Sequence, residues 1–123
     1  MTTQQLGQLT TARIYDESVA GRYRILVDRL WPRGVSKERA ALDEWLKDIA
    51  PSGPLRTEFA HMASRFEEFT VHYREELDAH PEPVEHVLSL LRQGRDVELL
   101  YAARDREINH ARVLRTYLLE RLT

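Results

Sequence analysis

Residues 25–37 read ILVDRLWPRGVSK, and this stretch decides how the chain is organised. Its start belongs to an apolar, β-branched run from Tyr23 to Leu30, which predicts a buried strand over about 23–30. Pro32 and Gly34 then stop the strand. Two arginines, a lysine and a tryptophan therefore gather where a buried strand surfaces. Ligand sites of open α/β sheets lie at such strand ends.

Two further strands are predicted, a short one near residues 12–16 and a buried one, VELLYAA, near 97–103. About six residues connect the short strand to the strand at 23–30, which is too few for a helical crossover. We therefore expect these two strands either to pair antiparallel or to lie apart in the sheet.

Helices are predicted where apolar residues recur at helical spacing: over about 37–50, from the start at Ser64 to about 79, over 84–93 and after residue 109 to about 122. A short helix is predicted after Ser52, through Leu55, Arg56 and Phe59. Ser36, Ser52 and Ser64 stand at expected N-caps, the last in the capping-box pattern SRFE. PEP at 81–83 is expected to stop a helix. Together the elements predict a single α/β domain over 12–123, with a small, mostly parallel sheet flanked by helices, after a flexible N-terminus over 1–11.

The composition excludes several classes of function. The chain has no cysteine, which removes disulfides, thiolate catalysis and cysteine-ligated zinc. A net charge of -2 disfavours a typical nucleic-acid binder, although a local basic patch remains open. No apolar run is long enough to span a membrane, and the start lacks the pattern of a signal peptide. We therefore expect a cytoplasmic protein without a membrane partner.

Polar residues follow both buried strands. After the first come Asp28, Arg29, Trp31, Arg33, Gly34 and Lys37, and the second ends with Tyr101, Arg104, Asp105, Asn109 and His110. If the two strands are parallel neighbours, these loops meet and form a cleft. Fixed positive charges, an aromatic face and the N–H groups of helix starts are features of an anion site.

Within this cleft His110 is the candidate proton carrier and Arg33 the candidate electrophilic stabiliser of a reaction. Simpler structural roles stay open: Asp28 could hold loop N–H groups, Trp31 could belong to the core, and Asn109 could cap a helix. Histidines 61, 72, 80 and 86 show no ligand spacing, and the common nucleotide-binding and hydrolase motifs are absent. The sequence thus predicts neither a metal site nor a cofactor.

Four motifs, VDRLWPRGVSKE, WLKDIAPSGPLR, FEEFTVHYREEL and LLYAARDREINHARVL, together resemble the family called domain of unknown function 488, in its YeaO-like branch. The resemblance covers about residues 12–119. It implies a compact α/β fold and a polar cluster at the strand ends, without an established reaction. The family motif adds Lys47, Ser52 and Arg56 to the candidate ligand-binding residues.

The chain departs from this family pattern at two places. More distant members carry Cys-His-Arg at the positions of Asn109, His110 and Ala111, in a loop similar to the anion-cradling loops of rhodanese- and phosphatase-type folds. Without the thiol, covalent sulfur or phosphoryl chemistry through a cysteine is excluded here. The family's His-Asp-Pro break is His61-Met62-Ala63 in this chain, which weakens any role for His61.

The preferred hypothesis is a protein that binds a small anionic or nucleotide-like ligand at the basic strand ends. The alternative is a regulatory or scaffolding module that contacts nucleic acid or a protein partner through the same loops. A third interpretation, a purely structural network of ion pairs, stays open because such networks also gather aspartate and arginine. The sequence leaves the oligomeric state open.

Overall fold

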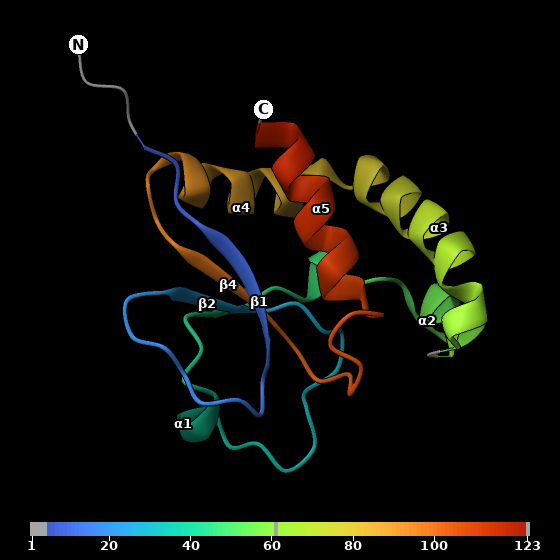
Figure 1. Ribbon diagram of the computed structural model, residues 1–123, viewed down its shortest axis with the longest axis horizontal. Helices are drawn as coiled ribbons and strands as arrows, with labels where there is room; N and C mark the ends of the chain where they lie inside the picture. Colours follow the sequence, from blue (N-terminus) through green and yellow to red (C-terminus); the bar gives the residue numbers. More distant parts are fainter. Residues whose placement is uncertain (1–4, 61, 123) are drawn as a thin grey trace.

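The computed structural model describes residues 5–60 and 62–122. Four parallel strands form one sheet in the order β1-β4-β2-β3, with β1 at Leu9–Arg13, β2 at Tyr23–Leu26, β3 at Glu44–Trp45 and β4 at Val97–Tyr101 (Figure 1). The predicted α/β class is confirmed. The strands are displaced or shorter than predicted, and β1 begins within the range assigned to a flexible N-terminus, of which residues 1–4 lie outside the described residues.

Alternate residues of the strands face two separate cores. Ile25, Val97 and Leu99 belong to the larger core, which the helices α2 (Gly53–Phe59), α3 (Phe66–Ala79), α4 (Pro81–Arg92) and α5 (His110–Leu122) cover. Leu26 and Leu100 belong to the smaller core, which lies under α1 (Lys37–Ala40) and the segment that follows β2. Figure 1 shows α1 on the opposite side of the sheet from α4 and α5. All five residues of β4 are buried, as a central parallel strand requires.

The connection between β1 and β2 settles the two alternatives left by the sequence. The strands are parallel and both pair with β4, which lies between them, so the expectation that they lie apart is right and antiparallel pairing is wrong. Residues 14–22 run back along the sheet without a helix or strand of their own.

The helix predicted over 37–50 is wrong beyond its first turn. It begins after Ser36, whose side chain caps it as predicted, but Ala41 adopts a left-handed conformation with φ 48° and ends it. Arg24 of β2 fixes this end, because its guanidinium donates to the carbonyl oxygens of Ala40 and Ala41 at 3.0 and 3.2 Å. The chain then pairs with β2 as β3 and forms a single 3-10 turn at Lys47–Ile49.

The other helices follow their caps. Ser52 caps α2 as predicted, accepting the N–H of Leu55. The capping box at Ser64 is wrong, because residues 63–65 form a 3-10 turn and α3 begins at Phe66. PEP does not stop a helix but begins α4 at Pro81, since proline is well suited to a first helical turn, where its missing N–H has no intrahelical partner. Gly94, with φ 85°, follows the end of α4.

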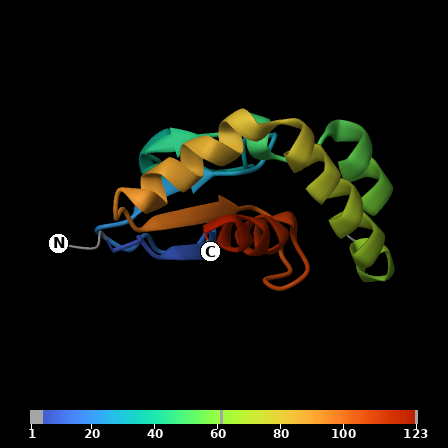
Figure 2. The ribbon, with the colours of Figure 1, turned by 90° about the horizontal axis from the view of Figure 1, so that it is seen from above.

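The helices α2 and α3 extend beyond the end of the sheet (Figure 2). Stacked rings of Phe59, Phe66 and Phe69 join the two helices, with centroids 4.5 to 6.2 Å apart. Asp78 connects α3 to α5 by accepting from the Tyr117 hydroxyl and the Arg121 guanidinium, each at 2.6 Å. In the part of the chain that the structure describes, no helix is long and apolar enough to cross a membrane.

Candidate ligand-binding cleft

A cleft of about 880 Å³ lies where β2 and β4 end, between the loops that follow these strands and the pair α2–α3. Three segments converge on it: residues 28–33 after β2, residues 102–110 after β4, and residues 51–59 leading into and along α2. The parallel pairing of β2 with β4 brings the first two segments together, and this pairing was the condition for the predicted cleft. The cleft lining comprises Tyr15, Asp28, Arg29, Leu30, Trp31, Pro32, Arg33, Pro51, Arg56, Thr57, Phe59, Phe69, Ala102, Ala103, Arg104, Asp105, Ile108, Asn109 and His110.

Asp28 connects the ends of the two strands. Its Oδ2 accepts the N–H of Ala102, just after β4, at 2.9 Å. Its Oδ1 lies 3.0 Å from Nε2 of His110, and both side chains are 14% exposed. The structural role foreseen for Asp28, holding a loop N–H, is therefore confirmed, and the same carboxylate faces the candidate proton carrier.

His110, the first residue of α5, has one ring nitrogen fixed by the fold. Nε2 lies 3.1 Å from the carbonyl oxygen of Val27 and 3.0 Å from Oδ1 of Asp28. A carbonyl oxygen only accepts, so Nε2 carries a proton and donates it. Among the described residues, Nδ1 has no hydrogen-bond partner. The Tyr73 ring packs edge-on against the imidazole at 6.4 Å between centroids and helps to hold its orientation.

Asn109 has the structural role foreseen for it. Its Oδ1 accepts the N–H of Arg112 at 3.0 Å, which caps α5, and its Nδ2 donates to the carbonyl oxygen of Asp105 at 2.8 Å. The carboxylate of Asp105 accepts the backbone N–H groups of Ile108 and Glu107, which lower its pKa. This pair of side chains shapes the loop that presents His110 to the cleft.

Of the four arginines that line the cleft, one holds the fold through hydrogen bonds of its side chain, and three are exposed without an ion-pair partner in the described part of the chain. Arg29 donates to the carbonyl oxygens of Pro51 and Ala50 at 3.0 and 3.2 Å and so holds the segment before α2. Arg33, Arg56 and Arg104 are exposed, and within residues 5–60 and 62–122 no carboxylate lies at ion-pair distance from them. Against four arginines the lining holds two aspartates, Asp28 and Asp105, so its formal charge is +2.

The apolar part of the cleft comes from the aromatic rings of Trp31, Phe59 and Phe69 and from two prolines. Trp31 is half-buried, donates from its indole N–H to the carbonyl oxygen of Val35 at 2.7 Å, and packs edge-on against Trp45 at 5.3 Å. It therefore belongs to the smaller core and to the cleft at once.

Five predicted site residues do not line the cleft: Gly34, Lys37, Lys47, Ser52 and Tyr101. Lys37 is an exposed residue of α1, and Lys47 lies over the Trp45 ring at 4.1 Å. Ser52 bonds to the carboxylate of Glu76 through its N–H and its hydroxyl. Tyr101 is 2% exposed, and burial raises its pKa. Gly34 adopts φ 73°, so its place in the motif is explained by the turn.

Several lining residues of the cleft were not predicted from the sequence. The sequence places Phe59 and Phe69 on apolar helix faces but does not indicate that they line a cleft. No sequence pattern predicts that α2 and α3 extend past the end of the sheet. Tyr15 had a signal that was not used, because it follows β1, a third strand that ends at the same edge. Its hydroxyl donates to the carbonyl oxygen of Arg33 at 3.1 Å, which joins the first and second strand ends.

Comparison with known proteins places this geometry in a family. The family model described as the inactive DUF488-N3 subclade matches residues 8–123. The chain belongs to the DUF488 family. It is 40% identical over 107 residues to the uncharacterized protein YeaO of Escherichia coli K12, which covers 86% of this chain and 92% of YeaO.

Other relatives of this DUF488 chain match it over a shorter region. It is 41% identical over 71 residues to uncharacterized proteins of Mycobacterium tuberculosis H37Rv and Mycobacterium bovis, over 57% of this chain and 60% of each relative. No solved structure matches. The YeaO-like resemblance noted from the four motifs is thereby confirmed, and those motifs supply both loops of the cleft. His61 lies outside the described residues.

Proposed function

We propose that the chain binds a small anionic, nucleotide-like ligand in the cleft at the ends of β2 and β4. The observation that carries this proposal is the lining itself: a formal charge of +2, with the exposed guanidinium groups of Arg33, Arg56 and Arg104 free of carboxylate partners among the described residues. Guanidinium groups form strong, often bidentate hydrogen bonds with phosphate and carboxylate. The rings of Trp31, Phe59 and Phe69 offer an apolar wall for a planar group.

Binding without turnover is the form of the proposal that we favour. The matching family model is described as inactive, and the chain has no cysteine at the position where the resemblance places one in distant members. Asn109 at that position is occupied in capping α5. A catalytic role for His110 and Arg33 stays a prediction, as does a cytoplasmic location. In the binding role, Nδ1 of His110 is available for a hydrogen bond to the ligand.

A thermal-shift screen of the purified protein tests the proposal. Phosphate, sulfate, nucleotides, sugar phosphates and short oligonucleotides would each be added over a range of concentrations. A ligand at 100 times its dissociation constant should stabilise the fold by about 2.7 kcal/mol. We expect a selective response to one class of small organic anion.

Variants then assign the response to the cleft. Arg33→Gln and Arg56→Gln should each weaken binding about tenfold or more, because a charge-assisted hydrogen bond contributes about 1.5–3 kcal/mol. Arg39→Gln is the matched control, since Arg39 is an exposed arginine of α1 outside the cleft. No response to any small anion, or equal losses in all three variants, would contradict the proposal.

A further inference from the structure

We propose that Glu58, Glu68 and His72 form a binding site for a divalent transition-metal ion of the Zn²⁺ type. One ligand atom from each of the three side chains lies within 4.8 Å of the other two. Glu58 comes from α2, whereas Glu68 and His72 lie four residues apart on one face of α3. The site is separate from the cleft, none of whose lining residues it contains, and it does not rest on the proposed ligand binding.

The distance between His72 and Glu58 is that of two ligands of one ion. Nδ1 of His72 lies 3.6 Å from Oε1 of Glu58, which is too long for a good hydrogen bond. Tetrahedral zinc with ligands at 2.0–2.2 Å separates its ligand atoms by about 3.4 Å. Since the three ligand atoms lie within 4.8 Å of one another, the third ligand needs to approach by at most about 1.4 Å, and Glu68 is an exposed side chain that can rotate to do so.

The charges around the three side chains favour a cation. Two carboxylates face each other here, and among the described residues neither Glu58 nor Glu68 pairs with a lysine or arginine. Arg65 is near, but its Nη1 donates to the backbone carbonyl oxygen of Glu58 at 2.8 Å and not to its carboxylate. Apart from His72, no positively charged side chain among the described residues lies at ion-pair distance from these carboxylates, so a bound cation would relieve their repulsion.

The donor atoms select the type of ion. One imidazole nitrogen with two carboxylate oxygens suits zinc and its first-row neighbours, whereas magnesium and calcium prefer oxygen ligands alone. Three protein ligands leave the fourth position to water. The side chains of His72 and Glu58 are 40% and 50% exposed, so an ion can reach them from solvent. Sequence spacing gave no signal for this site, because Glu58 comes from a different helix.

Calorimetric titration of the tag-free protein with ZnCl₂ tests the inference, and Co²⁺ absorption reports the ligand environment. We expect the wild-type chain to bind one equivalent of Zn²⁺. His72→Ala and Glu68→Gln should each weaken the affinity at least tenfold. Circular dichroism would verify that these surface variants remain folded.

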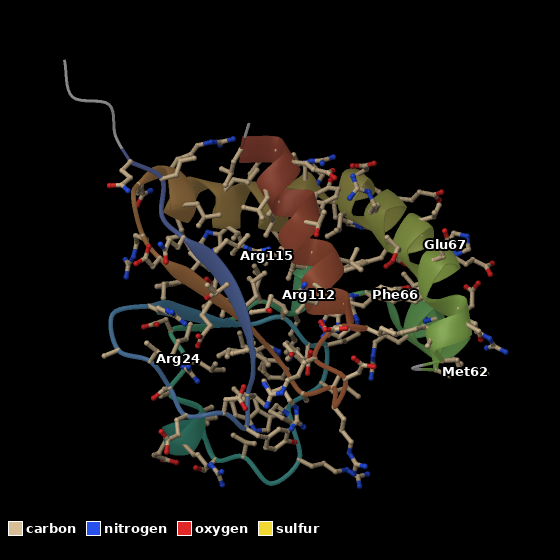
Figure 3. The ribbon with its side chains drawn as sticks, in the orientation of Figure 1. Arg24, Met62, Phe66, Glu67, Arg112 and Arg115 are labelled. Carbon is tan, nitrogen blue, oxygen red and sulfur yellow. The ribbon has the colours of Figure 1, made fainter. Side chains whose placement is uncertain are left out.

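Two controls separate this site from non-specific binding to surface side chains. His86→Ala removes an exposed histidine that faces a single carboxylate, Glu44, at 2.7 Å. Glu67→Gln removes the same charge as Glu68→Gln one residue earlier on α3, where Figure 3 labels Glu67. Both should leave Zn²⁺ binding unchanged, as should Arg33→Gln in the cleft. Absence of stoichiometric binding by the wild type, or an equal loss in either control, would overturn the inference.

Discussion

At the scale of single residues, the least ordinary feature is a buried network of charged side chains on the face of the sheet that α1 covers. Arg24 and Glu98 are 5% and 2% exposed, and the guanidinium of Arg24 binds Oε1 of Glu98 at 2.7 Å. Arg22 binds the other carboxylate oxygen at 2.8 Å. Both oxygens of the Glu98 carboxylate are thus paired, and Nε and Nη2 of Arg24 donate to the carbonyl oxygens at the end of α1. Such a network is tolerated only when it is fully satisfied.

Removing one partner should therefore be costly. We expect Glu98→Ala to lower the free energy of unfolding by about 3–5 kcal/mol, because Arg24 would stay buried without its counter-charge. Urea denaturation measures the change. Glu85→Ala is the matched control, because it breaks the surface ion pair between Glu85 and Arg92, whose two side chains are each at least half exposed. This variant should lower the free energy of unfolding by less than about 1 kcal/mol. Similar values for the two variants would contradict the role assigned to burial.

At the scale of elements, α5 positions both the cleft and the edge of the sheet. Its first residue, His110, lies in the cleft, while Arg115 one and a half turns later lies beside β1 and donates to the carbonyl oxygen of Leu9 at 2.8 Å (Figure 3). Asp16 accepts the N–H of Arg13 at the other end of β1. The side chains of Arg115 and Asp16 thus form hydrogen bonds with backbone groups of the edge strand β1. Because these groups are already bonded, they are not free to pair with a strand of another chain.

The start of α5 depends on Asn109. We expect Asn109→Ala to destabilise the fold by about 1–2 kcal/mol, since the side chain caps the helix and is buried. Asn109→Ser should retain most of the stability, because a serine hydroxyl can still accept the N–H of Arg112. Thermal denaturation with calorimetry compares the three proteins. An Asn109→Ala variant as stable as the wild type would show that the cap does not hold the helix.

The elements also show where sequence reasoning succeeds and fails. The buried strands and the caps at Ser36, Ser52 and Asn109 followed from local patterns. The meeting of the two strand ends was predicted only on the condition that the strands are parallel neighbours, which they are. The helix over 37–50 failed because backbone pairing of Glu44 and Trp45 with β2 overrides a helical spacing of apolar residues. The aromatic wall of the cleft could not be predicted for a similar reason. The position of α2 and α3 depends on contacts between residues distant in sequence, and no local pattern reports those contacts.

At the scale of the whole molecule, charge is unevenly distributed. The chain carries a formal charge of -2, yet the cleft lining carries +2, so the rest of the molecule is more acidic than the total suggests. Such a distribution would favour the entry of small anions into the cleft and would disfavour contact of a long polyanion with the surrounding surface. This argues for a small ligand over the alternative, in which the same loops contact nucleic acid.

Salt dependence separates these two functions. We expect binding of single-stranded oligonucleotides, measured by fluorescence anisotropy, to be weak and no tighter than that of a mononucleotide. Affinity for phosphate backbones falls steeply between about 50 and 200 mM salt, since each contact releases counterions. Tight oligonucleotide binding with such a slope, together with silence from small anions, would favour the nucleic-acid module. Binding confined to small anions would favour the cleft.

The strand order has a consequence for synthesis of the protein. β4, at residues 97–101, is the partner of both β1 and β2, and β1 pairs with no other described strand. A nascent chain that has reached residue 96 thus contains both partners of β4 but lacks β4 itself, the strand that joins them. Assembly of the four-stranded sheet must therefore wait until β4 has left the ribosome. Until then β1 and β2 present unpaired edges, the period in which chaperones matter most for a newly made chain.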